Sequence, residues 1–140
     1  MADYFTKFSV ILTLPNEAAQ QYALDLAANA SRALLDDGPS DMLPASIREA
    51  IEIWTFETEA DSVDGKRALW LHSSDGGIDA ACAFLQHLLQ KFDPQGRVEF
   101  EWSNDCSKPR VDAYGGGAVI ITAKKIKSMS TVEWLHKNAA

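Results

Sequence analysis

The first part of the chain carries two hydrophobic patterns in succession, one typical of a strand and one of a helix. Residues 4–14 are mostly β-branched, aromatic or aliphatic and contain no breaker, which predicts a buried strand. Pro15 ends that strand, and Asn16 is a favourable N-cap for a helix. Through residues 19–34 apolar side chains recur at three- and four-residue spacing, until Gly38-Pro39 ends the pattern. We therefore expect a strand followed by an amphipathic helix.

The middle of the chain predicts a loop and then a hairpin. Residues 38–47 combine prolines with small polar residues, which favours a loop with at most one short turn. Residues 51–60 and 67–73 are rich in β-branched and aromatic side chains, and each predicts a strand. Between them, Asp64-Gly65 is a dipeptide that favours a tight turn between antiparallel strands.

The last part of the chain predicts two helices and two strands. Apolar residues of 78–92 fall on one helical face. Residues 98–103 alternate apolar and polar side chains, which predicts a strand with one buried face, and residues 118–123 predict another strand. Ser130 and Glu133 form a capping box, which predicts a short C-terminal helix.

The predicted order is β-α-β-β-α-β, followed by an extra strand and the C-terminal helix. This order is typical of an α+β fold of the ferredoxin-like type, in which two helices cover one face of an antiparallel sheet. An α+β sandwich with another strand order would give the same pattern. No linker, repeat or low-complexity tract divides residues 1–140, so we expect a single domain. Such folds support many functions, and the fold class alone assigns no activity.

Charge is unevenly distributed along the chain. The net charge is −7, and residues 1–65, with 3 basic and 12 acidic side chains, contribute −9 of it, whereas residues 66–140 contribute +2. Nucleic-acid-binding proteins usually carry a basic stripe, so this balance argues against direct DNA or RNA binding. An acidic surface serves solubility and can also attract a basic protein partner.

The cysteines and histidines predict neither a disulfide framework nor a metal site. Cys82 and Cys106 are the two cysteines, and the three histidines lack metal-ligand spacing. No apolar run approaches the ~20 residues of a membrane-spanning helix, and the first residues do not have the pattern of a signal peptide. We therefore expect a cytoplasmic protein with reduced thiols, no cofactor and no membrane association.

Residues 104–117 form the segment that most resembles a site. They link two predicted strands, although hairpin connections usually have about two to five residues, and long loops in compact domains are often functional. The candidate binding residues are a thiol, four charged or phenolic side chains and a glycine run: Cys106, Lys108, Arg110, Asp112, Tyr114, Gly115, Gly116 and Gly117.

Four interpretations of this segment remain open. The glycines could expose backbone N–H groups to an anion beside Lys108 and Arg110, although they lack a phosphate-loop framework. Cys106 could act as a nucleophile, although no histidine lies nearby in the sequence. Arg110 and Tyr114 are residue types favoured at protein-binding hot spots. In the plainest interpretation the glycines form a bulge or close contact, and Lys108 and Asp112 form a surface ion pair.

Two weaker candidates lie in the predicted hairpin. His72 and Asp75 lie where a strand ends before a helix, but no partnered nucleophile accompanies them beyond Ser73 or Ser74. Acidic residues cluster in the segment 57–64 and form either a solvated hairpin or a surface that imitates nucleic-acid phosphates.

The stretch FEWSNDCSKPRVDAYGGGAVIITA, followed by MSTVEWL, resembles a family of small uncharacterised proteins encoded in bacterial genomes, plasmids and phages. The resemblance is strongest over residues 98–135 and weaker over the opening strand. It implies an accessory or mobile-element setting, in which small acidic proteins often bind a host or defence protein, and it implies no catalytic residues.

The sequence thus favours a non-enzymatic cytoplasmic protein that binds a protein partner through the 104–117 loop and an acidic surface. The alternative is a small-anion binder or an enzyme that uses Cys106, Lys108 and Arg110. A homodimer formed through the sheet is a third hypothesis, which requires an exposed edge strand.

Overall fold

The protein forms an α+β fold built on one sheet, in a computed structural model that describes residues 2–36 and 42–139. The α+β class predicted from the sequence is confirmed. The elements in chain order are β1 (Tyr4–Thr13), α1 (Glu17–Asp36), α2 (Ala45–Glu49), the 3₁₀ turn η1 (Ile51–Ile53), β2 (Glu57–Val63), β3 (Lys66–Ser73), α3 (Ile78–Phe92), β4 (Arg97–Cys106), β5 (Gly115–Thr122), β6 (Ile126–Ser130) and α4 (Thr131–Asn138).

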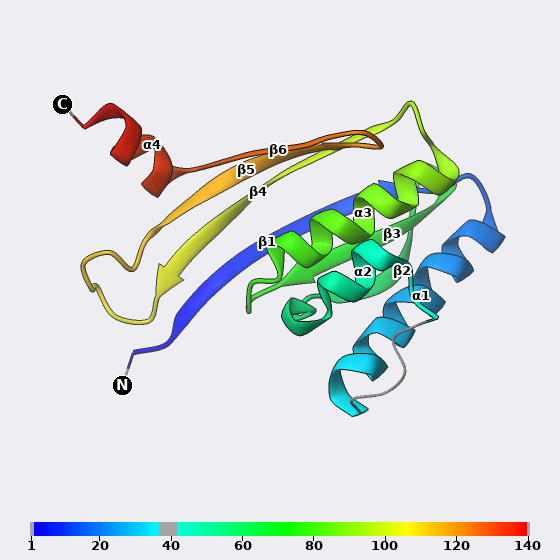
Figure 1. Ribbon diagram of the computed structural model, residues 1–140, viewed down its shortest axis with the longest axis horizontal. Helices are drawn as coiled ribbons and strands as arrows, with labels where there is room; N and C mark the ends of the chain where they lie inside the picture. Colours follow the sequence, from blue (N-terminus) through cyan, green and yellow to red (C-terminus); the bar gives the residue numbers. More distant parts are fainter. Residues whose placement is uncertain (1, 37–41, 140) are drawn as a thin grey trace.

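The sheet has six antiparallel strands in the order β2-β3-β1-β4-β5-β6. Helices α1, α2 and α3 lie over one face of it, while α4 lies apart, beyond one end of β5 and β6 (Figure 1). Alternation along β1 explains this layering, because Phe8, Val10 and Leu12 point into the core while Ser9 and Ile11 point to the other face. The sheet therefore has one covered face and one open face.

The core lies between the sheet and α1–α3. Leu85, Leu88 and Leu89 of α3 are almost fully buried there, in agreement with the predicted apolar face of that helix, and Phe84, which was not assigned to that face, is fully buried as well. Burial of a large apolar side chain stabilises the folded state by about 1.5–3 kcal/mol, so this face of α3 is a main contributor to stability. No helix among the described residues has the length and apolar character needed to cross a membrane.

The predicted strand at residues 51–60 is wrong in its first half. Residues 51–53 form η1, and β2 begins only at Glu57. Between the two, Trp54 and Phe56 insert into the core, where the Trp54 ring lies 4.7 Å from that of Phe56 and 5.4 Å from that of Phe84. Trp54 and Phe56 are of residue types common in strands, but in this protein their side chains enter the core from the turn before β2.

Strand β6 was not predicted at all. The extra strand expected after β4 is β5, and β6 pairs with β5 at the edge of the sheet. Lys124 and Lys125 precede it and Lys127 lies within it, and charged side chains of this kind are typical of edge strands. By contrast, Asp64 (φ 50°) and Gly65 (φ 80°) confirm the predicted turn between β2 and β3. The predicted end of the first helix at Gly38-Pro39 lies outside the described residues.

Candidate functional site

The 104–117 segment is mostly strand rather than loop. Strand β4 continues to Cys106, which lies opposite Tyr4 of β1, and β5 already begins at Gly115. Only residues 107–114 connect the two strands; we call them the β4–β5 connection. The expectation of a long loop was wrong. The glycine run suggests a flexible segment, but its residues pair in register with β4 as part of β5.

The glycines are required by close packing. A Cβ atom at Gly117 would lie 2.3 Å from Cζ2 of Trp102 and 2.3 Å from the carbonyl oxygen of Met129. A Cβ atom at Gly116 would lie 2.2 Å from the carbonyl oxygen of Trp102. The Gly116 N–H donates to Oγ1 of Thr131 at 3.1 Å. These contacts match the plainest interpretation of the run, a close approach of neighbouring strands.

The β4–β5 connection has a defined shape although its side chains are exposed. Its first residue, Ser107, donates its N–H to the carbonyl oxygen of Asp3 at 2.9 Å, and its Oγ accepts from the Asp3 N–H at 2.8 Å. The Tyr114 hydroxyl donates to the carbonyl oxygen of Lys108 at 3.2 Å, which closes the connection on itself. Asp112 adopts a left-handed conformation (φ 65°), and Ala113 is buried.

This closed connection presents a small amphipathic surface. Val111 is 90% exposed and Tyr114 56% exposed, and both cations, Lys108 and Arg110, are exposed beside them. The predicted ion pair between Lys108 and Asp112 is not among the ion pairs that the described residues form. The two cations are therefore available at the surface. A basic and apolar tip of this kind suits binding to a protein.

The two thiols differ sharply in their surroundings, and both are free. Burial, and then the nearby Asp79 carboxylate, raise the pKa of the Cys82 thiol to about 12, so Cys82 is protonated and inert at neutral pH. Cys106 is half-buried at the end of β4. Within the described residues no hydrogen bond joins its thiol to a histidine.

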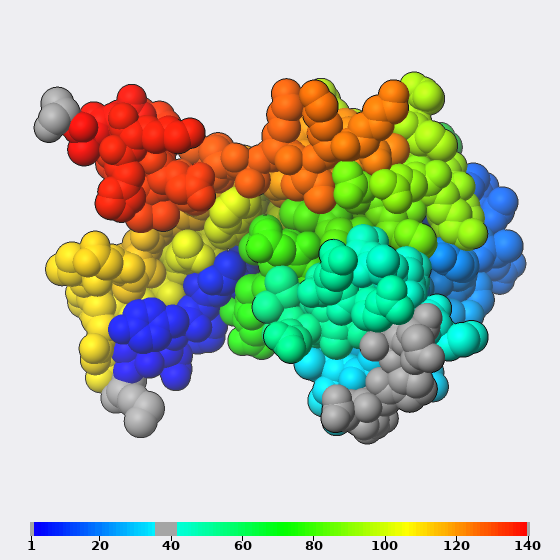
Figure 2. Space-filling model, in the orientation of Figure 1, coloured from blue at the N-terminus to red at the C-terminus, as the bar shows by residue number. Residues whose placement is uncertain are grey.

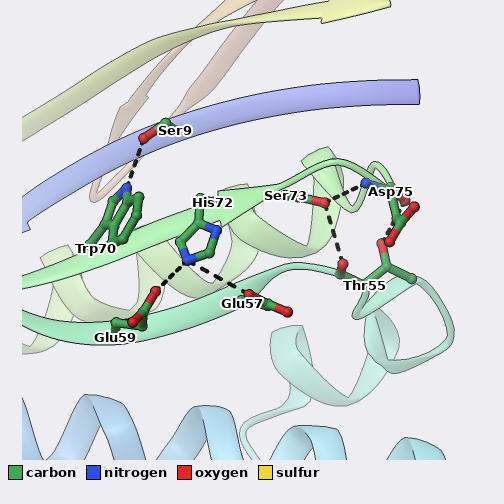
Figure 3. Close-up of polar contacts among 8 residues, drawn as sticks. All are labelled: Ser9, Thr55, Glu57, Glu59, Trp70, His72, Ser73 and Asp75. Carbon is green, nitrogen blue, oxygen red and sulfur yellow. Dashed lines mark hydrogen bonds and ion pairs between the residues drawn. The ribbon is translucent and has the colours of Figure 1, made fainter. Parts of the chain in front are cut away.

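A second polar cluster lies on the open face of the sheet (Figure 3). The His72 ring stacks on Trp70 with centroids 4.0 Å apart, and its Nε2 lies 2.6 Å from Oε2 of Glu59 and 3.8 Å from Oε2 of Glu57. Trp70 in turn donates its Nε1–H to Oγ of Ser9 at 2.7 Å. Three neighbouring strands thus fix the Glu59 carboxylate, while Glu57 remains 77% exposed.

His72 and Asp75 do not form a site together. The Ser73 hydroxyl donates to the carbonyl oxygen of Thr55 at 3.3 Å and accepts from the Asp75 N–H at 2.9 Å. Thr55 Oγ1 donates to the carbonyl oxygen of Asp75 at 3.0 Å (Figure 3). Ser73 and Asp75 therefore shape the turn before α3, and His72 faces the open side of the sheet.

Three of the four acidic residues of segment 57–64 belong to an edge strand, and the fourth, Asp64, lies in the turn after it. Glu57, Glu59 and Asp61 project from β2 on the open face, opposite His72, Trp70 and Ala68 of β3. The sequence predicted the acidic cluster but not its position at a sheet edge, because strand order is not readable from local pattern. Among the described residues, no group of three or more His, Cys, Asp and Glu side chains is placed to hold a metal ion.

No protein-family model, no curated protein and no solved structure matches this chain.

Proposed function

We propose that the protein is a non-enzymatic, cytoplasmic binding protein that engages a protein partner through the β4–β5 connection and an acidic surface. The observation that carries this proposal is the closed connection itself, which exposes Val111 and Tyr114 beside Lys108 and Arg110. The accessory or mobile-element setting implied by the sequence resemblance is part of the proposal.

Preorganisation supports a binding role for this surface. The bonds of Ser107 to Asp3 and of Tyr114 to Lys108 hold the backbone before any partner arrives. Ordering a flexible side chain on association costs about 0.5–1.5 kcal/mol, so a loop that is already ordered binds with less entropic penalty. Tyrosine and arginine are among the residue types enriched at interface hot spots.

Other exposed apolar side chains lie at the same end of the molecule. The β4–β5 connection, the start of β1 and helix α4 gather there (Figure 2). Tyr4 is 63% exposed, Trp134 56% and Leu135 62%. A partner that contacts the connection therefore meets further apolar surface nearby, which is how a binding surface reaches a useful area.

The acidic surface is the second part of the proposal. Glu57, Asp61 and Asp64 on or beside β2 would attract a basic surface and speed its approach. As to the fold, we propose that β1 to β4 with α1 and α3 constitute a ferredoxin-like unit, because their strand order is β2-β3-β1-β4 with all pairs antiparallel. Strands β5 and β6 and helix α4 extend that unit.

The experiment is affinity capture from the native host, followed by binding measurements with the purified partner. Wild type is compared with K108A/R110A, with Y114A, and with R32A/R48A as a control that removes the same charge from exposed positions on α1 and α2. We expect wild type and the control to retain one stoichiometric protein. K108A/R110A and Y114A should bind it at least about tenfold more weakly, as expected for hot-spot truncation.

Two results would refute the proposal. One is equal retention by all four proteins, and the other is a partner whose contacts, mapped by NMR shift changes, lie away from residues 107–114. If no protein is retained, titration of inorganic phosphate into wild type and K108A/R110A tests the alternative, a small-anion binder that uses Cys106, Lys108 and Arg110. Saturable phosphate binding that the variant loses would favour that alternative.

A further inference from the structure

The two edges of the sheet carry opposite charges. Strand β2 contributes Glu57, Glu59 and Asp61, and no lysine or arginine lies between Glu57 and Val63. At the other edge, residues 124–130 contain three lysines and no acidic side chain. Both strands are edge strands, so each presents backbone N–H and C=O groups able to pair with another strand.

The directions of the strands make these two edges compatible. All five strand pairs are antiparallel, so direction alternates across the six-stranded sheet and its first and last strands, β2 and β6, run oppositely. When a second copy lies beside the first in the same orientation, its β2 therefore meets β6 as an antiparallel neighbour. The alternation then continues from one molecule into the next.

Apolar surface lies beside each edge, at the ends that would meet. In this arrangement the C-terminal end of β6 lies next to the N-terminal end of β2 in the second copy. Helix α4 follows β6 and exposes Trp134 and Leu135, which line a hollow of ≈ 360 Å³ together with Met129 and Thr131. Beside the start of β2 is a groove of ≈ 410 Å³, with walls that include Leu24, Ala27, Trp54 and Phe56.

Helix α4 and this groove begin on the same face of the sheet. The groove lies on the covered face, because α1 forms one of its walls. Oγ1 of Thr131, the first residue of α4, lies 2.7 Å from the Cβ position of Gly115. Side chains alternate between the two faces along β5, and Gly115 lies an even number of residues from the buried Val119 and Ile121. Its Cβ position therefore also faces the covered side. Met129, which lines the hollow beside α4, pairs with Ala118 and so lies on the open side, and the hollow therefore borders that face as well. Apolar surface is thus available near the joined strands, in addition to charge.

We infer that the protein associates with itself head to tail, the β6 edge of one copy pairing with the β2 edge of the next. Symmetric pairing is opposed by charge, because two β2 edges would oppose acidic residues and two β6 edges would oppose lysines. A heterologous contact of this kind generates rings or open chains rather than isolated dimers. The inference specifies an occupant for the acidic surface of the proposed function and does not involve residues 107–114.

Charge reversal on matched pairs of residues tests this arrangement. One variant is E57K/D61K on β2, and the other is K125E/K127E at the β6 edge; both leave Glu59 and its contact with His72 intact. Sedimentation velocity is measured from about 10 μM to about 1 mM protein, at about 0.02 M and about 0.5 M salt. Wild type should show a weight-average mass that rises with concentration at low salt and falls at high salt.

Each variant alone should associate at least about tenfold more weakly than wild type, because both of its edges then carry charge of one sign. An equimolar mixture of the two variants should associate again, and so should the fourfold variant that combines them. If the single variants had lost association because they were unfolded, mixing or combining them would not restore it. If either variant is unfolded by circular dichroism, the neutral pairs E57Q/D61N and K125Q/K127Q replace the reversals, with weaker association expected for each.

Three results would overturn the inference. They are a wild type that remains monomeric at every concentration, single variants that associate as wild type does, and a mixture that fails to recover. A mass that stops at the dimer and persists in E57K/D61K would instead indicate symmetric pairing. The variant K108A/R110A should associate normally, and K125E/K127E, which changes neither the β4–β5 connection nor the acidic surface, should still bind a partner. Failure of self-association is therefore separable from failure of the proposed function.

Discussion

Replacing Gly117 with alanine tests whether the glycine run serves packing. The added methyl group would lie 2.3 Å from Cζ2 of Trp102 and 2.3 Å from the carbonyl oxygen of Met129. The indole ring has some freedom to move, but the carbonyl belongs to the backbone of β6 and can move only with that strand. We therefore expect Gly117→Ala to displace β6 and to destabilise the folded state.

The magnitude follows from two opposing effects. Extra methyl groups in closely packed positions cost about 1–3 kcal/mol, and the backbone contact places this site near the upper part of that range. Alanine gains about 0.5–1 kcal/mol over glycine within a strand, because its unfolded chain has less conformational freedom. The net loss in free energy of unfolding is therefore about 1.5–2 kcal/mol. For a domain of this length that corresponds to a fall in Tm of about 5–10 °C.

The assay is thermal and urea unfolding of Gly117→Ala, Trp102→Phe and the double variant. Because Phe lacks the outer ring atoms that the methyl group meets, the double variant should be more stable than the sum of the single effects predicts, by at least about 0.5 kcal/mol. Gly65→Ala is the control, since no atom lies within 4 Å of its Cβ position. It should lower the free energy of unfolding by about 1–2 kcal/mol because of its left-handed backbone (φ 80°). It should show no coupling to Trp102→Phe. A wild-type Tm for Gly117→Ala, or coupling near zero, would refute the packing argument.

Two further predictions concern ionisable groups of α3, the Cys82 thiol and the His87 imidazole. Because burial raises the pKa of Cys82 to about 12, an alkylating reagent at neutral pH should modify Cys106 first and Cys82 only in denaturant; equal rates by mass spectrometry would contradict this. Burial, and then Lys91, lower the pKa of His87 below 6.5, so its contribution to stability is present above pH 6.5 and is lost as the pH falls towards the folded-state pKa. Urea unfolding from about pH 7.5 to about pH 5 should show this loss, and His87→Gln should reduce it; an unchanged slope in that variant would contradict it.

The sequence predicts most closely the elements whose periodicity reflects burial directly. The apolar residues of β1 alternate because one face of the sheet is covered and the other is open, and those of α3 repeat because one helical face is buried. The same reasoning fails at Trp54 and Phe56. Their side chains enter the core from a turn, and a short aromatic run does not distinguish that arrangement from a strand.

The candidate site was predicted in composition but not in structure. Exposed Lys108, Arg110 and Tyr114 do lie at a hairpin tip, yet the bonds that fix its shape run to backbone carbonyls, which leave no trace in the sequence. The glycine run was misread as a loop because its constraint comes from Trp102 and Met129, which lie in other strands. Pairing between distant strands decides such positions, and local pattern does not report it.

Strands β5 and β6 change the charge of one sheet edge, and this effect connects the two proposals. Without them the sheet would end at β4, whose Glu99, Glu101 and Asp105 outnumber its single cation, Arg97. Two acidic edges would then repel one another in every pairing of copies. The uncharged β5 and the lysine-bearing segment of β6 replace the acidic edge with a basic one, and the same extension forms the β4–β5 connection that presents Lys108 and Arg110. In the two proposals, one addition to an α+β sheet therefore supplies both a defined tip for a partner and a complementary edge for a second copy, on separate sets of residues.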